Sequence, residues 1–99
     1  MKVRILTSGF DDLAAGRRFY DLQQMSVGDY FFDSLFSEID SLAIYAGTHG
    51  VHFGYHRMLA RRFPYAIYYK VTGADVMVYR VLDCRREPNW IKRALETKG

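Results

Sequence analysis

The chain has 99 residues and a mass of 11.6 kDa, the size of one domain with no room for a second hydrophobic core. Hydrophobic residues make up 49% and charged residues 25%, which excludes a disordered chain. No apolar run approaches the ~20 residues that span a bilayer, and a lone cysteine, Cys84, excludes an internal disulfide. The start, MKVRILTSGFDD, has too short an apolar stretch for a signal peptide. We therefore expect a single cytoplasmic domain over residues 1–99, with no membrane contact and no cofactor.

The two halves of the chain differ in charge. Residues 1–54 carry four basic and seven acidic side chains, a net charge of −3, whereas residues 55–99 carry ten basic and four acidic ones, a net charge of +6. One interpretation is a solvated basic surface on the C-terminal half. The other is an electrostatic footprint for nucleic acid or for an acidic protein, and charge alone does not separate the two.

The chain begins with a predicted strand and a predicted helix. Residues 2–6 (KVRIL) alternate enough to favour a short strand. A first helix is expected over about 9–24, with Thr7 or Ser8 as its N-cap and two aspartates near its positive end.

The second predicted helix, about 29–46, has the clearest periodicity in the chain. Gly28 interrupts the preceding pattern, and Asp29 suits the position of an N-cap. Apolar side chains then recur at helical spacing: Phe32, Leu35, Phe36, Ile39, Leu42 and Ala43. The two helices are expected to pack as an antiparallel pair joined by a short turn.

The second half of the chain predicts a sheet. After a glycine-rich loop at 46–54, strand patterns follow at 55–63, 64–71 and 76–82. Gly73 suits the hairpin turn between the last two strands, and Pro88 suits the first turn of a short terminal helix. The predicted fold class is therefore α+β in the order β-α-α-β-β-β-α, with two antiparallel helices packed on a mostly antiparallel four-stranded sheet.

The strand at 64–71 has two distinct faces. Period-two geometry places on one face Tyr65, Ile67, Tyr69 and Val71. The opposite face receives Ala66, Tyr68 and Lys70. Such a strand packs against a core on one side and is open to a partner on the other.

Three stretches of the chain resemble the RelE/ParE toxins of type II toxin–antitoxin systems. Residues 61–88 (RRFPYAIYYKVTGADVMVYRVLDCRREP) are similar to the family's arginine-rich strand, aromatic strand, hairpin and final Arg-Arg-acid-Pro corner. Residues 26–43 resemble its second helix and residues 11–23 its first. The resemblance implies a compact growth-inhibiting toxin of the plasmid-stabilisation kind, neutralised by a cognate antitoxin that is encoded beside it.

The family has two functional branches, and the RelE branch cleaves messenger RNA on the ribosome. That chemistry needs cations to stabilise charge on the phosphate, together with groups that accept and donate a proton. Carried onto this chain, Arg57 and Arg85 match two catalytic positions of the branch. The other catalytic positions fall on residues that do not fill their roles: Leu59, Ala66 and, for the tyrosine, Trp90 or Ile91. If the chain is an enzyme, the resemblance implies an endoribonuclease with a reduced catalytic set.

The ParE branch lacks that catalytic set and poisons DNA gyrase by protein contact, and this chain resembles it better. The chain departs from the wider pattern at Asp83 and Cys84, where a histidine and a glycine often stand. A ParE-like toxin directed at gyrase is thus the leading hypothesis. The alternatives are the RelE-like endonuclease and a decayed toxin that only binds its antitoxin, since a fold does not determine a function.

A basic rim is the predicted partner-binding surface, because neighbouring strands bring its residues together. Its members are Arg57, Arg61, Arg62, Arg80, Arg85, Arg86 and Trp90. These side chains suit an acidic antitoxin segment, gyrase or RNA. The other interpretation is that some of the arginines are edge charges that discourage sheet-to-sheet aggregation.

Three histidines and the cysteine carry weaker signals. His49, His52 and His56 are spaced by three and four residues, but glycines surround the first two and no carboxylate lies nearby in sequence. We therefore expect no metal site. Cys84 has arginines beside it but no assigned base, so it is not predicted to be a nucleophile.

Overall fold

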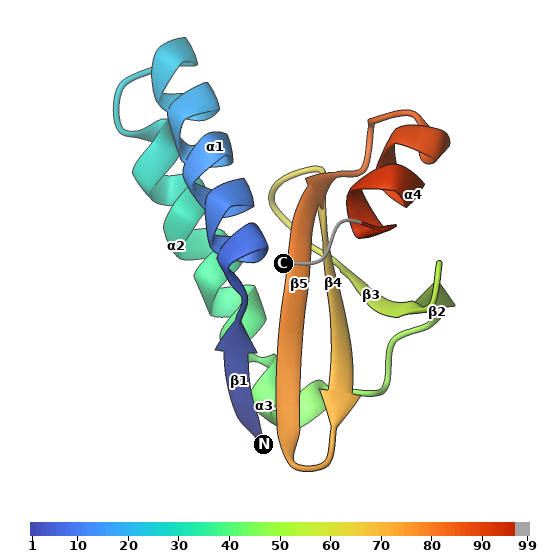
Figure 1. Cartoon of the computed structure of the whole chain (residues 1–99). Helices are drawn as coiled ribbons and strands as arrows, with labels where there is room; N and C mark the ends of the chain where they lie inside the picture. The colour runs from blue at the N-terminus through green and yellow to red at the C-terminus, as the bar shows by residue number, and fades with distance from the viewer. Residues whose placement is uncertain (97–99) are drawn as a thin grey trace.

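The computed structural model describes residues 1–96 as a sheet with helices on both of its faces (Figure 1). The first half of the chain forms one strand and three helices, and the second half forms antiparallel strands and a terminal helix. The elements in chain order are β1 (Lys2–Ile5), α1 (Thr7–Gln23), α2 (Val27–Asp40), α3 (Leu42–Tyr45), β2 (Val51–His52), β3 (Tyr55–Leu59), β4 (Tyr65–Thr72), β5 (Asp75–Asp83) and α4 (Pro88–Glu96).

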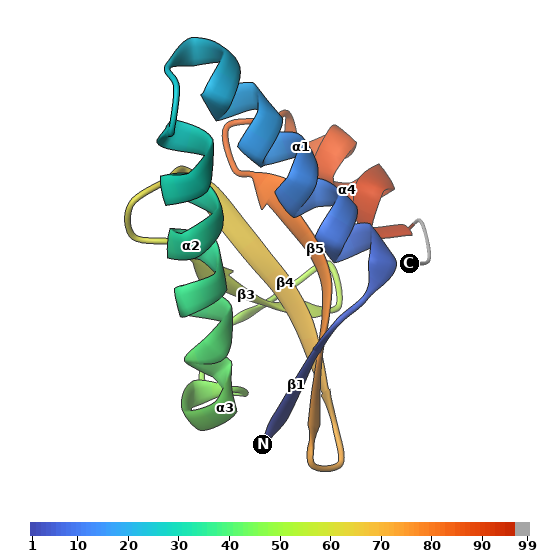
Figure 2. The same ribbon diagram turned by 90° about the vertical axis from the view of Figure 1, so that its left-hand side faces the viewer.

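The strands are arranged in the order β1-β5-β4-β3-β2. β1 runs parallel to β5, and the other neighbouring pairs are antiparallel. α1 and α2 lie side by side over one face of the sheet, whereas α4 packs on the other (Figure 2). The predicted α+β class and its mostly antiparallel sheet are confirmed, with one additional short strand, β2.

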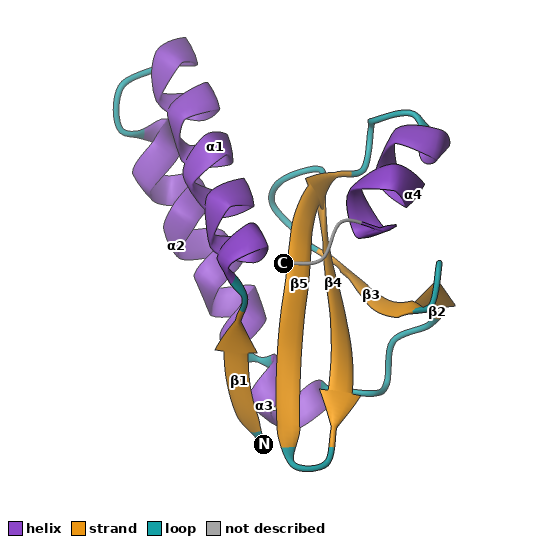
Figure 3. Cartoon of the chain, viewed as in Figure 1, coloured by secondary structure: helices purple, strands orange, loops and turns teal. Residues whose placement is uncertain are grey.

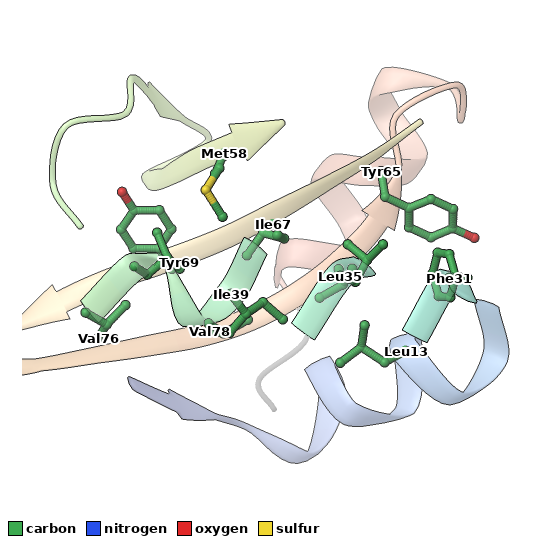
Figure 4. Packing of buried hydrophobic residues seen from close by; sticks show 12 residues of the cluster. Leu13, Phe31, Leu35, Ile39, Met58, Tyr65, Ile67, Tyr69, Val76 and Val78 are labelled. Carbon is green, nitrogen blue, oxygen red and sulfur yellow. The ribbon is translucent and has the colours of Figure 1, made fainter. Parts of the chain in front are cut away.

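The main core fills the space between the α1–α2 pair and the sheet (Figure 4). Helix residues Leu13, Phe31 and Leu35 are fully buried there against Ile67 and Val78 of the strands. Burial of each such side chain stabilises the fold by about 1.5–3 kcal/mol relative to leaving it exposed. This layer therefore holds the helical pair on the sheet.

A second, smaller core lies on the opposite face of the sheet, beneath α4. It consists of Ala66, Tyr68, Leu82, Ile91 and Leu95. Tyr65, Ile67 and Tyr69 belong instead to the main core, so the predicted alternation of β4 between two faces is confirmed. The expectation that the second face is open to a partner is wrong, because α4 covers Ala66 and Tyr68 there. A register shift opposite Tyr68 and Tyr69 adds one residue to β5, so Val81 faces the main core together with Val76 and Val78.

Close contact between α1 and α2 depends on two glycines. A Cβ at Gly16 would come within 2.5 Å of the Phe31 ring, and one at Gly28 within 2.3 Å of the Arg17 carbonyl oxygen. The missing side chains thus allow the helices to approach each other. Within residues 1–96, no helix combines the length and the apolar character that crossing a membrane requires.

The predicted helix caps are wrong. α1 has Leu6 at its N-cap, and Ser8 instead donates its hydroxyl to the Tyr79 carbonyl oxygen at 2.6 Å. Asp29 lies in the first turn of α2 and pairs with Arg17.

The amide of Gly28, at the start of α2, is capped from the neighbouring helix. It donates to Asp21 Oδ1 at 2.8 Å. A carboxylate brought in by tertiary packing therefore serves the role that a local residue was expected to fill.

Two segment boundaries also differ from the sequence-based prediction (Figure 3). The strand expected over 55–63 ends at Leu59, because residues 61–64 form the connection to β4. The helix expected over 29–46 breaks at Ser41 into α2 and the single turn of α3.

Candidate partner-binding surface

One end of the sheet brings together two arginine-bearing segments that are separate in sequence. The Cys84 amide donates to the Pro64 carbonyl oxygen at 2.9 Å, and Tyr65 stands opposite Asp83 in the ladder. The connection before β4 and the turn after β5 therefore lie side by side. They carry four exposed arginines, which we call the arginine rim: Arg61, Arg62, Arg85 and Arg86.

The connection before β4 is attached to α2 by Glu38. One carboxylate oxygen of Glu38 accepts the Arg61 amide at 2.6 Å, and the other lies 3.4 Å from the Arg61 guanidinium. The Arg61 side chain is nevertheless 82% exposed. Arg62 is exposed and makes no ion pair with any residue in 1–96. Both guanidinium groups are thus accessible to a partner.

Arg85 forms a two-point contact with the end of β5. Its Nε and Nη2 atoms donate to the two carboxylate oxygens of Asp83 at 3.0 and 2.7 Å. These hydrogen bonds hold the pKa of Asp83 below its ordinary value, although partial burial acts in the opposite direction. The guanidinium is oriented by this contact but stays largely solvent-exposed. A fixed, exposed guanidinium suits recognition of a second carboxylate or a phosphate.

Arg86 lies on Trp90 and forms the mouth of a groove. The guanidinium carbon is 3.8 Å from the centroid of the indole ring, a cation–π contact. The groove below has a volume of about 340 Å³ and runs between α1, the end of β5 and α4. Arg86 and Trp90 both line the groove, so these two predicted partner contacts form one continuous surface with it.

Arg80 is largely buried and lines the same groove as Arg86 and Trp90. It donates to both carboxylate oxygens of Asp12 at 2.7 and 2.9 Å and to the Ala94 carbonyl oxygen at 2.7 Å. The hydrogen bonds to Asp12 raise the pKa of Arg80, and burial opposes them. Because its donors already connect α1, β5 and α4, we leave Arg80 out of the proposed surface. Its role as a partner contact stays a prediction.

Arg57 lies on β3, on the face that α4 partly covers. It stands opposite Tyr68, whose pKa is raised by burial and held down in part by the charge and hydrogen bond of Arg57. The next residues on this face are Leu59 and Ala66, which also stand opposite each other. Towards the end of β3, the neighbours of Arg57 on this face are therefore apolar.

Two of the three histidines, His49 and His56, take part in a polar cluster around a buried tyrosine. Tyr69 is fully buried, and its hydroxyl accepts the Gly47 amide at 3.0 Å and lies 2.5 Å from His49 Nδ1. The Tyr69 hydroxyl and His49 Nδ1 therefore share a hydrogen bond whose direction depends on the tautomer of His49. His56 stacks on the Tyr69 ring and donates through Nδ1 to the His49 carbonyl oxygen at 2.7 Å.

Sequence reasoning did not identify two parts of this arrangement. Asp12 and Arg80 are 68 residues apart, and no local pattern connects them. The role of Tyr69 was also not foreseen, although three histidines just before a strand with paired tyrosines are the signal that points to it.

The comparisons with known proteins identify the fold. No protein-family model and no curated protein matches the sequence. Among solved structures, one similar chain comes from the chromosomal ParDE TA system of P. aeruginosa. The TM-score is 0.74 at 15% sequence identity, over 82% of this chain and 92% of that chain. The protein thus has the fold of a chain from a ParDE system, as the resemblance noted in the sequence implied.

Proposed function

We propose that the protein is the toxin of a type II toxin–antitoxin pair, which arrests growth until a cognate antitoxin binds it. The observation that carries the proposal is the likeness to a ParDE chain over most of both chains. A fold alone does not determine a function, so the arginine rim is the second support.

The arginine rim suits an antitoxin segment of acidic character. Within residues 1–96 the guanidinium groups of Arg62 and Arg86 make no hydrogen bond or ion pair, and the Arg61 side chain is mostly exposed. Charge-assisted hydrogen bonds from such groups to carboxylates are roughly twice as strong as neutral ones. The groove beside Arg86 and Trp90 gives the same segment an apolar contact.

For the cellular target, we propose protein contact with DNA gyrase rather than cleavage of RNA. Only Arg57 and Arg85 match the catalytic positions that the RelE resemblance implies. Arg57 stands opposite Tyr68 in the ladder, and Arg85 is hydrogen-bonded to Asp83. The α4 residues at the position of the expected tyrosine are Trp90 and Ile91, which do not transfer a proton. A surface of this kind supports binding better than phosphoryl chemistry.

Two assays on the purified protein separate the possible targets. Supercoiling by gyrase should decrease as the protein is added, and primer extension on translated messages should show no new ends. New ends that disappear in Arg85→Ala would instead establish the endonuclease. Unchanged supercoiling together with uncut messages, but with antitoxin still bound, would identify a decayed toxin.

A further inference from the structure

The turn between β2 and β3 contains a bulky residue in an unfavourable backbone conformation. His52 and Tyr55 are paired, so Phe53 and Gly54 form a two-residue hairpin loop. Their φ angles are 56° and 85°, both in the left-handed region. Turns with two positive φ angles favour Asn-Gly, whereas a phenylalanine at the first position is strained. Backbone strain of this kind is concentrated at functional sites, so Phe53 is a candidate functional residue.

Phe53 forms one wall of a pocket on the face of the sheet that α4 covers. The pocket has a volume of about 500 Å³ and is also lined by Tyr55, Tyr79 and the last turn of α4. The Tyr55 and Tyr79 rings meet edge to face with their centroids 5.2 Å apart. Tyr55 is held in place because its hydroxyl donates to the Leu95 carbonyl oxygen at 2.9 Å. The aromatic walls are therefore fixed before any ligand arrives.

Two lysines give the pocket its positive charge. The Lys70 ammonium lies 4.6 Å from the centroid of the Tyr55 ring and 5.6 Å from that of Tyr79. Lys92 enters from α4. Within residues 1–96 neither lysine forms an ion pair, although Glu96 also lines the pocket. The Lys70 ammonium contacts the faces of aromatic rings, which are not oxygen acceptors. Its N–H groups are therefore available to donate hydrogen bonds to an anion.

We propose that this pocket binds an aromatic ring that carries a phosphate or a carboxylate. The ring packs against Phe53 and Tyr79, and the anionic group is held by Lys70 and Lys92. In its left-handed turn position the Phe53 side chain lines the pocket, a role that gives a strained residue a function there. None of these residues belongs to the arginine rim, so the inference is independent of the proposed function.

Titration of the purified protein with six small probes tests the chemistry. Uridine 5′-monophosphate and indole-3-acetate each combine a ring with an anion, whereas inorganic phosphate, uridine, acetate and indole supply one part each. We expect at least one combined probe to bind about tenfold more tightly than either part, by calorimetry or NMR shifts. The tighter of the two tells whether a phosphate or a carboxylate is preferred. Equal affinity for phosphate alone would overturn the proposal.

Variants then locate the binding. Lys92→Met, at an exposed helix position, should weaken the combined probe about tenfold, and so should Lys70→Met if that variant folds. Lys2→Met on β1 is the matched control and should leave affinity unchanged. Glu96→Gln should tighten binding, because it removes a like charge beside the anion.

Phe53→Asn is expected to raise the stability of the protein and to lower its affinity for the combined probe. Asparagine suits the first position of this turn, so the melting temperature should rise. The pocket loses its wall, so affinity for the combined probe should fall. A higher melting temperature with unchanged affinity would show that Phe53 is only a strained turn residue and would contradict the assignment. None of these measurements depends on an effect on growth. Their outcome therefore tests the pocket separately from the toxin proposal.

Discussion

The carboxylate of Asp12 on α1 and the guanidinium of Arg80 on β5 form a paired contact at 2.7 and 2.9 Å, with both side chains more than four-fifths buried. The same carboxylate accepts the Val81 amide at 2.9 Å. β1 is paired with β5 only up to Val78, so beyond that point Asp12 satisfies an edge donor of β5. Arg80 extends the connection to α4 through Ala94. One ion pair therefore joins three elements.

Asp12→Ala is predicted to destabilise the protein by about 3–5 kcal/mol, since it leaves the buried charge of Arg80 without a partner. Denaturant unfolding measures the change. The exposed neighbour Asp11 offers the matched control, because Asp11→Ala should change stability by at most ~0.5 kcal/mol.

A double change distinguishes a charge effect from a packing effect. Asp12→Leu combined with Arg80→Met should cost less than Asp12→Ala alone, because no uncompensated charge remains. If the two single changes simply add, the pair is not a coupled unit and the account of this contact is wrong.

Gly16→Ala should destabilise the helical pair by about 1–3 kcal/mol, even though alanine is the better helix former by about 1 kcal/mol. The reason is that the new Cβ would lie 2.5 Å from the buried Phe31 ring. Thermal unfolding tests this result, with Gly50→Ala as control, since a Cβ there meets only His52 at 3.7 Å. Phe31→Leu in the Gly16→Ala background should recover part of the loss. No recovery would show that the ring is not the obstacle.

Stability should decrease as the pH falls below the ordinary histidine pKa of about 6.5. Burial, with a smaller contribution from the charge of His56, holds the pKa of His49 below that value. The unfolded chain therefore binds the proton more readily, and the stabilisation present above pH ~6.5 is lost as pH falls towards the folded pKa.

Melting temperatures between pH 8 and pH 5 measure this effect on the wild type and on His49→Gln, which keeps an acceptor without titrating in this range. The pH slope should flatten in His49→Gln. His52→Gln is the control, since His52 is not a hydrogen-bond partner of Tyr69. An equal flattening in both variants would assign the slope to histidines in general rather than to the Tyr69 cluster.

Arg85→Ala combined with Arg86→Ala should leave the melting temperature close to that of the wild type, because both side chains are exposed. Antitoxin binding should weaken about tenfold or more, as charge-assisted contacts are lost. Arg4→Ala removes another exposed, ion-paired arginine, on β1, and should leave binding unchanged. A clear fall in melting temperature with binding retained would mean that Arg85 and Asp83 form a structural corner and no binding surface.

Much of the fold was predictable because its signals are local. The apolar spacing around Phe31 and Leu35 predicts the second helix, and the alternation from Tyr65 to Lys70 predicts a strand with two distinct faces. That the second face is covered by α4 was not predictable from this local pattern. Strand β2 was missed because Phe53 occupies a turn position where asparagine or glycine is the usual signal.

The candidate site was only partly predictable, because its geometry depends on contacts distant in sequence. Arg85 and Arg86 are identified by their position after the last strand, and the Pro64–Cys84 hydrogen bond brings Arg61 and Arg62 beside them. Nothing near Arg80 in sequence indicates that its guanidinium will form hydrogen bonds with Asp12. Likewise, the cap of α2 is Asp21, on another helix, so local capping rules identify the wrong residue.

The viable count of growing cells after induced expression of the protein decides whether the chain is a toxin. The count should fall when the chain is expressed alone and recover when the short reading frame beside its gene is expressed with it. The double change Arg85→Ala and Arg86→Ala should weaken the response to that second protein. Normal growth while the folded wild-type protein accumulates would contradict the assignment of this chain as a toxin.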